Sequence, residues 1–503
     1  MGGEVIRRVL IANRGEIALR VIRACHTASI DTVAVYSDAD AAAPHVHAAR
    51  TAVRIGPAPA AESYLNVGAL IDAARQTGAD AVHPGYGFLS ERAHFARAVE
   101  EAGLIFIGPT SGAIARLGSK TGARTLMEAA GVPVVPGAAS EDQSDAALIA
   151  AATALGVPLL VKPASGGGGI GMKTVRHLDE LATALPQARR EAQSAFGNPT
   201  LYLERLVECP RHIEVQVFAD AHGHTVHLFE RECSAQRRHQ KVIEETPSPA
   251  VTPAVRARIG AAAVTAAEAV GYRNAGTVEF LLEGDGDQAK FYFLEINTRL
   301  QVEHPITECV VGVDLVRAQI AVASGEELPW RQGDLAQRGH ALECRIYAED
   351  PAQGFLPQAG PLLRYREPSG PGIRVDSGVI EGGTVSVYYD PMLAKLITWG
   401  ETRTESVARA LEALSRFEIL GVRTNIAFLM AILRHQDFVA GRIDTGFLRR
   451  ELGTLTAALA ELPPALAAAA AWHASRGAAR PAGAGPAALS QSDPFETLRG
   501  WRG

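Results

Sequence analysis

The sequence is poor in cysteine and has no long apolar run, and each absence argues against a class of protein. Its five cysteines are odd in number and scattered, without a C-x-x-C pair to suggest zinc or a redox couple. We expect buried thiols at Cys25, Cys209, Cys233, Cys309 and Cys344. No uncharged apolar run reaches the length of a bilayer span, and the first residues enter a strand pattern without a signal-peptide core. These absences predict a cytoplasmic protein that does not bind membranes.

The sequence also lacks an excess of positive charge. It has 49 Lys and Arg against 55 Asp and Glu, a formal net charge of −6, which does not suit binding to nucleic acid. Any anion must therefore be held by a local group of basic side chains. With 47% hydrophobic and 21% charged residues in 503, the chain has a globular composition and is too long for one ordinary core. We expect several packed subdomains.

Two common nucleotide-binding motifs are missing. The G-x-G-x-x-G fingerprint is absent, which argues against a nicotinamide cofactor. A Walker A loop is absent as well, because residues 118–121 read Gly-Ser-Lys-Thr, in the wrong order for that motif.

Strand and helix patterns alternate in the N-terminal part of the chain. The expected strands are residues 6–12, 32–36, 81–83 and 104–107, and the expected helices are 16–25 and 91–102. This alternation predicts a doubly wound, Rossmann-like α/β domain up to about residue 115.

The patterns after residue 116 predict a different architecture. A small unit at about 133–205 contains a strand at 159–162 and a helical pattern at 178–195. From 213 to about 452, strands such as 213–218, 276–282 and 291–296 alternate with helices such as 253–270, which predicts an α+β body. Beyond 455 the sequence becomes rich in Ala, Gly and Pro, as in a linker.

A glycine-rich loop, residues 165–172, directly follows the strand that contains Lys162. Glycine lets the backbone approach a phosphate chain closely, so the loop is typical of a phosphate cover. Lys162 and Lys120 would then be point charges on the phosphates. The structural alternative is a flexible linker, although linkers rarely run directly from a lysine on a strand.

Two strand patterns separated by Gly-Asp-Gly-Asp at 284–287 predict a β-hairpin. Glu295 and Asn297 share a face of the second strand, because side chains alternate, and the hairpin can bring Glu279 opposite them. Such an oxygen-rich clamp suits Mg²⁺ on nucleotide phosphates. The alternative is a set of solvated positions on a half-exposed sheet. The bulky apolar residues beside them favour the clamp.

An arginine, an amide and a carboxylate follow at alternate positions, Arg299, Gln301 and Glu303. One small anion could contact all three, since the guanidinium offers a planar fork and Glu303 could take a proton. A second basic run, residues 236–241, precedes the acidic pair Glu244 and Glu245. By itself such a run indicates a solvated face equally well.

Together these segments resemble the biotin carboxylases of the ATP-grasp superfamily over about residues 5–452. The resemblance lies in residues 11–18 (IANRGEIA), 83–91 (HPGYGFLSE), the glycine-rich loop, 236–241 (QRRHQK), 295–305 (EINTRLQVEHP) and 343–350 (ECRIYAED). It implies a ligase that carboxylates biotin with ATP and bicarbonate through carboxyphosphate, the first half-reaction of an acyl-CoA carboxylase.

The resemblance implies four segments. These are an N-terminal pre-ATP-grasp domain at 1–115, an ATP-grasp domain at 116–330 with a mobile glycine-rich lid at about 133–205, a C-terminal biotin carboxylase domain at 331–452, and an Ala/Pro-rich linker at 453–503. Residues 493–503 look like the entry into the middle domain of longer α-subunits, so we hypothesise truncation at a domain boundary.

The resemblance also implies the site residues. Contacts with ATP are expected from Lys120, Lys162, Gly168, Gly169, Glu204, Arg205, Val207, His212, Gln236, His239, Glu279 and Glu295. Magnesium, or manganese in its place, is expected on Glu279, Glu295 and Asn297. Bicarbonate is expected among Lys241, Arg299, Gln301 and the backbone of Val302, with Glu303 as its general base. Arg345 is expected to stabilise the biotin enolate, with Asp390 near the biotin end. The catalytic set is Glu303, Arg345, Lys241 and Arg299.

Three positions depart from the usual pattern of the family. Pro163 follows the lid lysine, and Ile170 stands where relatives often have Arg or Lys, which bears on lid stiffness and its nucleotide contacts. Arg205 stands where many relatives have Lys, with little expected effect.

The expected partners follow from a missing motif. A Met-Lys-Met biotinylation site is absent, since Met172-Lys173 is followed by Thr174. Biotin must then be supplied on a carrier domain or protein, with a carboxyltransferase subunit as second partner and a homodimer or larger complex as the assembly.

Two rival functions remain. Another ATP-grasp ligase, for carbamoyl phosphate or amino acids, would share the lid and the metal clamp, but the Arg299, Gln301, Glu303 series and Arg345 argue against it. A nucleotide-binding regulatory subunit would need the loss of a catalytic group, and none of the matched positions is lost.

Overall fold

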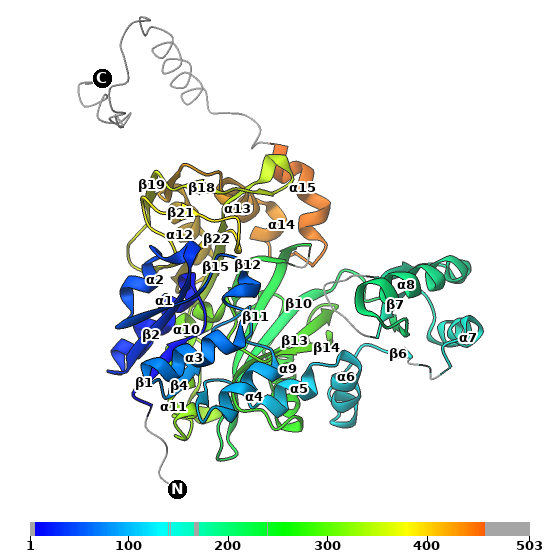
Figure 1. Cartoon of the computed structure of the whole chain (residues 1–503). Coiled ribbons are helices and arrows are strands. Elements are labelled where there is room, and N and C mark those ends of the chain that lie inside the picture. Colours follow the sequence, from blue (N-terminus) through cyan, green and yellow to red (C-terminus); the bar gives the residue numbers. More distant parts are fainter. Residues whose placement is uncertain (1–5, 139, 141, 165–170, 239, 458–503) are drawn as a thin grey trace, which may run out of the picture. The chain divides into compact units, whose positions relative to one another are not determined.

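The computed structural model of the protein describes residues 6–138, 140, 142–164, 171–238 and 240–457 (Figure 1). Internal contacts divide the chain after Thr456, and the elements below belong to the first unit, apart from Ala457, the final residue of the last helix. Within the described ranges, none of the helices has the length and apolar character needed to cross a bilayer.

The N-terminal part is a five-stranded parallel sheet in the order β3-β2-β1-β4-β5. Its strands are β1 (Arg8–Ile11), β2 (Asp31–Ser37), β3 (Thr51–Gly56), β4 (Ala81–His83) and β5 (Ile105–Phe106), and its helices are α1 (Gly15–Thr27), α2 (Pro44–Ala48), α3 (Val67–Thr77), α4 (Ala93–Glu101) and α5 (Ser111–Leu117). Alternate residues of β1 enter different cores, Val9 with Ile17 of α1 and Leu10 with Phe95 of α4. Both faces of the sheet are therefore covered, which confirms the predicted Rossmann-like domain.

A second, smaller sheet has the order β6-β9-β7-β8 and is antiparallel. It consists of β6 (Gly137–Ala138), β7 (Leu159–Pro163), β8 (Lys173–Val175) and β9 (Leu201–Arg205), with α7 (Asp145–Leu155) and α8 (Leu181–Phe196). Leu148, Leu159, Leu185 and Leu203 belong to its own apolar cluster. The strand predicted at 159–162 and the helix predicted near 178–195 are confirmed. The limits proposed for the lid stay a prediction.

The largest element is an eight-stranded antiparallel sheet in the order β14-β13-β10-β11-β12-β15-β22-β20. In chain order these strands are β10 (Arg211–Ala219), β11 (Thr225–Arg237), β12 (Gln240–Thr246), β13 (Asn274–Glu283), β14 (Lys290–Asn297), β15 (His340–Tyr347), β20 (Ile373–Ser377) and β22 (Met392–Gly400). Because β12 pairs with β15, the sheet continues across the boundary predicted at residue 330. Residues about 100 positions apart in the chain, such as Glu244 and Arg345, thereby lie on adjacent strands.

The remaining helices and short strands pack around this sheet or belong to the C-terminal part of the chain. The helices are α6 (Lys120–Ala129), α9 (Pro253–Ala269), α10 (His304–Val311), α11 (Leu315–Ala323), α12 (Arg403–Ser415), α13 (Ile426–Arg434), α14 (Gln436–Val439) and α15 (Phe447–Ala457). The short strands are β16 (Glu349–Asp350), β17 (Leu356–Pro357), β18 (Gly360–Pro361), β19 (Arg364–Arg366), β21 (Thr384–Val385) and β23 (Glu418–Leu420).

The cysteine prediction needs a correction. Cys25, Cys233 and Cys344 are buried as expected, but Cys309 is half-buried and Cys209 is exposed. Cys209 lies in the short connection between β9 and β10 with a φ of 48°, a turn conformation at the surface. Sequence composition could not distinguish this turn from a buried run.

His83, the last residue of β4, generates a prediction about acid stability. The Gly85 N–H donates to His83 Nδ1 at 3.0 Å, so the ring proton is on Nε2, which lies 3.2 Å from Gln319 Oε1. Burial lowers the pKa of His83 to about 4.

Acidification should therefore favour the unfolded chain. Below about pH 6.5 an unfolded histidine binds a proton, whereas native His83 binds one only near its lowered pKa of about 4. This contribution to stability is complete above pH 6.5 and declines by roughly 2 kcal/mol between pH 6.5 and pH 5. Urea unfolding at pH 7 and pH 5 should show wild type losing about 2 kcal/mol more than His83→Gln. Equal losses in the two proteins would contradict the assignment.

Candidate active site

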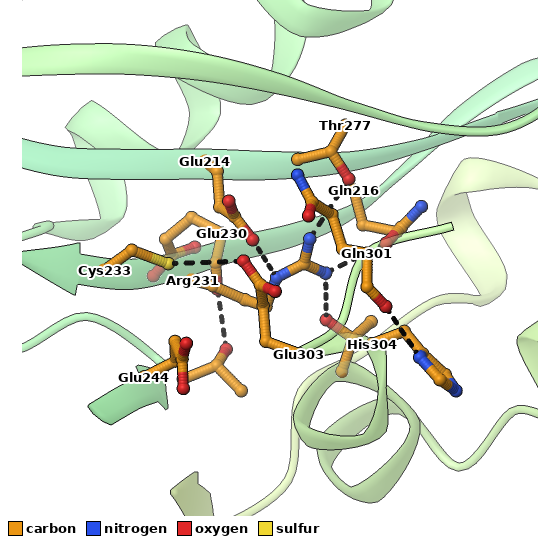
Figure 2. Close-up of polar contacts among 12 residues, drawn as sticks. Glu214, Gln216, Glu230, Arg231, Cys233, Glu244, Thr277, Gln301, Glu303 and His304 are labelled. Atoms are coloured by element: carbon orange, nitrogen blue, oxygen red, sulfur yellow. Dashed lines mark hydrogen bonds and ion pairs between the residues drawn. The ribbon is translucent and has the colours of Figure 1, made fainter. Parts of the chain in front are cut away.

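The predicted catalytic residues gather on one face of the eight-stranded sheet, where the segment 297–303 leads into α10. Figure 2 shows this region, with Glu303 lying between the strands and the start of α10. Glu303 is fully buried. Its surroundings come from the consecutive strands β10, β11 and β12 and from β15, which is distant in the sequence but lies next to β12 in the sheet.

Lys241, on β12, connects three carboxylates of this face. Its ammonium donates to Glu279 at 2.9 Å, to Glu303 at 2.7 Å and, in a very short contact, to Glu214. Burial lowers the pKa of Lys241, but the surrounding acidic groups raise it well above its ordinary value. The lysine is therefore charged, and it allows three carboxylates to share a buried site.

Arg345, on β15, holds the opposite side of Glu303. Its Nη2 donates to Glu303 Oε2 at 3.0 Å and its Nε donates to Glu244 Oε1 at 2.6 Å. Burial by itself raises the pKa of Glu303, but Lys241 and Arg345 outweigh it and hold that pKa well below the ordinary value. Glu303 is thus an ionised carboxylate, in the form that can accept a proton.

Arg231 is a central residue that the sequence analysis missed. It is fully buried on β11, with Nε donating to Glu214 and with Nη1 2.9 Å from both Gln216 Oε1 and Thr307 Oγ1. Figure 2 shows its guanidinium among side chains from β10, β13 and α10. The signal was available, because Arg231 lies between two glutamates in a strand, and a charged triplet in a buried strand requires partners.

Lys395, on β22, is a second missed residue. It is fully buried, donates to the Val302 carbonyl oxygen at 2.7 Å and lies 3.2 Å from Glu16 Oε1. Glu16 also accepts a very short hydrogen bond from Tyr86. Lys395 thereby connects Glu16 of the N-terminal domain to the backbone of the residue that precedes Glu303.

Arg299 and Gln301 lie beside these carboxylates, as their alternate spacing predicted. Arg299 Nη1 donates to Gln301 Oε1 at 2.9 Å, and Gln301 Nε2 is 3.4 Å from Glu279 Oε1. Arg299 also pairs with Glu91, 3.1 Å away, and its Nη2 donates to Asn297 Oδ1 at 3.1 Å. The structure therefore brings Arg299, Gln301 and Glu303 into one network.

The hairpin of β13 and β14 has the predicted register. Glu279 lies opposite Glu295, and Thr277 lies opposite Asn297. Phe280 pairs with Phe293, so Leu294 is an extra residue that forms a β-bulge. Two carboxylates and an amide oxygen on this hairpin are hard oxygen donors, a set that fits Mg²⁺.

Another group of donor atoms is better explained by lysine than by a metal. Ligand atoms of His212, Glu214 and Glu279 lie within 4.8 Å of one another. Lys241 already donates to both carboxylates, and His212 Nε2 lies 3.0 Å from Glu279 Oε2. The ammonium supplies the positive charge that these carboxylates need.

The residues expected around ATP lie in two regions, the smaller sheet and the eight-stranded sheet. On the smaller sheet, Lys162 forms a very short ion pair with Glu204, and Arg124 Nη1 is 3.3 Å from the same carboxylate. Arg205 makes a two-point ion pair with Glu283 at 2.8 and 2.9 Å. Val207 is buried in the connection to β10, His212 pairs with Glu279, and Gln236 lies opposite Lys241 in the register of β11 and β12.

Some predicted positions are not brought into the Glu303 network or cannot be placed. Asp390 is exposed and caps a turn by accepting from the Met392 N–H at 2.8 Å. It stands two residues before Met392 of β22, which lies opposite Tyr347, the last residue of the strand that carries Arg345. Gly168, Gly169 and His239 lie outside the described residues, as do Ile170 and the side chain of Lys120.

Three regions of the chain match known families. Residues 5–114 match the biotin carboxylase N-terminal domain, 119–331 the ATP-binding domain of the carbamoyl-phosphate synthase L chain, and 343–450 the biotin carboxylase C-terminal domain.

Individual relatives are similar over most of this chain. It is 51% identical over 454 residues to a biotin carboxylase of Halalkalibacterium halodurans, covering 90% of this chain and 99% of that protein. It is 52% identical over 446 residues to a mitochondrial methylcrotonoyl-CoA carboxylase subunit alpha of Oryza sativa. That match covers 88% of this chain and 60% of the rice protein, so the chain spans little more than half of this longer relative.

A solved structure has the same fold. The biotin carboxylase domain dimer of a 2-oxoglutarate carboxylase from Hydrogenobacter thermophilus, in complex with MgADP, ADP and bicarbonate, gives a TM-score of 0.83 at 44% identity. The match covers 90% of this chain and 99% of that one.

The burial of Arg231 generates a stability prediction. Arg231→Met should lower the free energy of unfolding by about 3–5 kcal/mol, because it leaves Glu214 short of a buried counter-charge. Urea or thermal unfolding measures the loss. The surface pair of Arg54 and Asp38 is the matched control, and Arg54→Met should leave the free energy of unfolding nearly unchanged, because both side chains are exposed. The prediction fails if the two substitutions cost the same.

Proposed function

The chain belongs to the biotin carboxylase family, whose members are ATP-dependent ligases, and we propose that it uses ATP and bicarbonate to carboxylate biotin on a carrier protein. The observation that carries this proposal is the buried, ionised Glu303, shared by Lys241 and Arg345 beside Arg299 and Gln301. This arrangement places a proton acceptor among cations that suit a small oxyanion.

In the proposed reaction, nucleotide occupies the region between the smaller sheet and the hairpin. Lys162, Glu204 and His212 are described residues of the expected ATP set, and they lie on the two sheets that border this region. Glu279, Glu295 and Asn297 would hold Mg²⁺, which neutralises charge on the nucleotide phosphates when bound. The lid would exclude water from the reactive intermediate.

Bicarbonate would be bound by Lys241, Arg299, Gln301 and the backbone of Val302. Glu303 accepts the bicarbonate proton, a bicarbonate oxygen attacks the γ-phosphorus, and the bond from that phosphorus to ADP breaks. The products of this step are carboxyphosphate and ADP. Lys395, by donating to the Val302 carbonyl, fixes the backbone of the segment that carries Glu303.

Carboxyphosphate would then break into CO₂ and phosphate, and phosphate would accept the N1 proton of biotin. The resulting enolate attacks CO₂ through N1, and the guanidinium of Arg345 stabilises the negative charge on its oxygen. Asp390, two residues before the start of β22 beside the end of β15, is proposed to lie near the biotin end.

The proposed partners are a carrier protein, a carboxyltransferase and a second copy of this chain. The Hydrogenobacter thermophilus relative is described as a domain dimer, and the rice relative is a subunit of a larger carboxylase. We propose an acetyl-, propionyl- or other acyl-CoA as the final acceptor, chosen by the carboxyltransferase. The predicted cytoplasmic location stays a prediction, since the rice relative is named mitochondrial.

The rival ligases share only the central region. The N-terminal and C-terminal matches favour biotin carboxylase, because the carbamoyl-phosphate synthase match is confined to residues 119–331. The experiment that tests the proposal measures bicarbonate-dependent ATP hydrolysis with and without free biotin. Turnover that ignores biotin would favour another ATP-grasp ligase.

Glu303→Gln should preserve the fold and MgATP binding and remove biotin-dependent turnover, because an amide cannot accept the bicarbonate proton. Loss of a general base lowers the rate by roughly 10²–10⁴-fold. ADP release under saturating bicarbonate and biotin measures the rate, with nucleotide binding by calorimetry as the control. Near-normal turnover would exclude Glu303 as the base.

Arg345→Ala should separate the two halves of the reaction. Carboxyphosphate formation does not use the enolate-stabilising charge, so ADP release should continue, while fixation of labelled bicarbonate into acid-labile carboxybiotin should fall about 10²-fold or more. The two rates are measured in the same samples. Proportional loss of both would place Arg345 in bicarbonate or nucleotide binding instead.

A further inference from the structure

Glu244 is a buried carboxylate that the proposed mechanism leaves without a role. It lies on β12 with its whole side chain buried, and its Oε1 accepts from Arg345 Nε at 2.6 Å. Its Oε2 is also buried and has no hydrogen-bond partner among the described residues. A half-paired buried carboxylate is costly, so its position calls for an explanation beyond packing.

The guanidinium of Arg345 is shared between two carboxylates. Nε binds Glu244 and Nη2 binds Glu303, at 2.6 and 3.0 Å. The backbone of Arg345 is fixed separately, because Asn425 Nδ2 donates to its carbonyl oxygen at 2.9 Å. The direction of the guanidinium therefore depends on its side-chain partners, which are the two carboxylates and the nearby Tyr347.

The proposed reaction changes one of these partners. When Glu303 accepts the bicarbonate proton it becomes neutral, so its ion pair with Arg345 is lost and its bond to Nη2 weakens. Nη2 is then available for the enolate oxygen. Glu244 remains as the anionic partner that keeps Nε in place.

Repulsion between the carboxylates of Glu244 and Glu303 supports this change of partner at Arg345. Burial, followed by the nearby Glu303 charge, raises the pKa of Glu244 to about 7 against the opposing effects of Arg345 and Lys241. Cross-strand Glu343, whose own pKa is raised by burial, also faces this group. Neutralising Glu303 removes one repulsive charge, so Glu244 becomes more fully ionised as Arg345 needs a new counter-ion.

We infer that Glu244 is a positioning residue, which holds Arg345 toward biotin once Glu303 has taken the bicarbonate proton. The inference rests on the proposed function, because it requires Glu303 and Arg345 to act in successive steps. Without Glu244, no carboxylate holds Nε once Glu303 is neutral, and the guanidinium loses the contact that directs it toward biotin.

The test compares substitutions at Glu244 in the full chain with MgATP, bicarbonate and free biotin. The readout is the ratio of carboxybiotin formed to ADP released, which a merely structural defect would leave unchanged by lowering both together. Glu244→Gln keeps an acceptor for Nε without the charge, and its ratio should fall about threefold. Glu244→Leu loses both, and its ratio should fall more than about tenfold.

Glu245 provides a matched control on the same strand. It is also buried and bound by an arginine, with Arg403 Nε at 2.6 Å, but it faces His340 and not Arg345. Glu245→Gln should keep the wild-type ratio even if it lowers stability.

The order of ratios decides the matter. The inference is supported if the ratio of carboxybiotin to ADP is highest in wild type, lower in Glu244→Gln and lowest in Glu244→Leu, while Glu245→Gln keeps the wild-type ratio. A wild-type ratio in Glu244→Gln, or an equal fall in Glu245→Gln, overturns it even if Glu244→Leu does not fold. A wild type that carboxylates no biotin would instead contradict the proposed function, and the inference with it.

Discussion

The balance between buried carboxylates and buried cations is the constraint on which the site depends. Glu214, Glu279 and Glu303 all accept hydrogen bonds from one ammonium, that of Lys241, within a buried region. Isolated carboxylates in such surroundings would take up protons. With the lysine and two arginines present, Glu303 stays ionised, which is the state that the proposed proton transfer needs.

The eight-stranded sheet makes this balance possible. The strands from β13 to β22 in the sheet order contribute charged residues to the same network, and the antiparallel pairing brings them close together. Because β12 pairs with β15, the C-terminal strands supply Arg345 and Lys395 to a surface that begins with the hairpin of β13 and β14. The N-terminal domain contributes Glu16 to the same network. Stability and the geometry of the site therefore depend on the same contacts.

Shared contacts also connect the successive steps of the proposed reaction. Arg345 bridges Glu303 and Glu244, so a change of protonation at one carboxylate alters the hold on the guanidinium. A site built from separate ion pairs would not transmit this change. The network thus offers a physical reason why proton transfer and charge stabilisation can occur in order.

Local patterns in the sequence were sufficient to predict the Rossmann-like domain and the hairpin that sets Glu279 opposite Glu295. They were also sufficient to predict the series Arg299, Gln301, Glu303. The reason is that period-two alternation and turn residues act over short distances in the chain. Glu244 was seen only as part of an acidic pair, and Arg231 and Lys395 were missed. Their partners lie on strands whose pairing is decided by long-range register. Likewise, the exposure of Cys209 depends on a turn between two sheets. Which charges share a buried space is a property of the assembled sheet, and only the tertiary structure decided it.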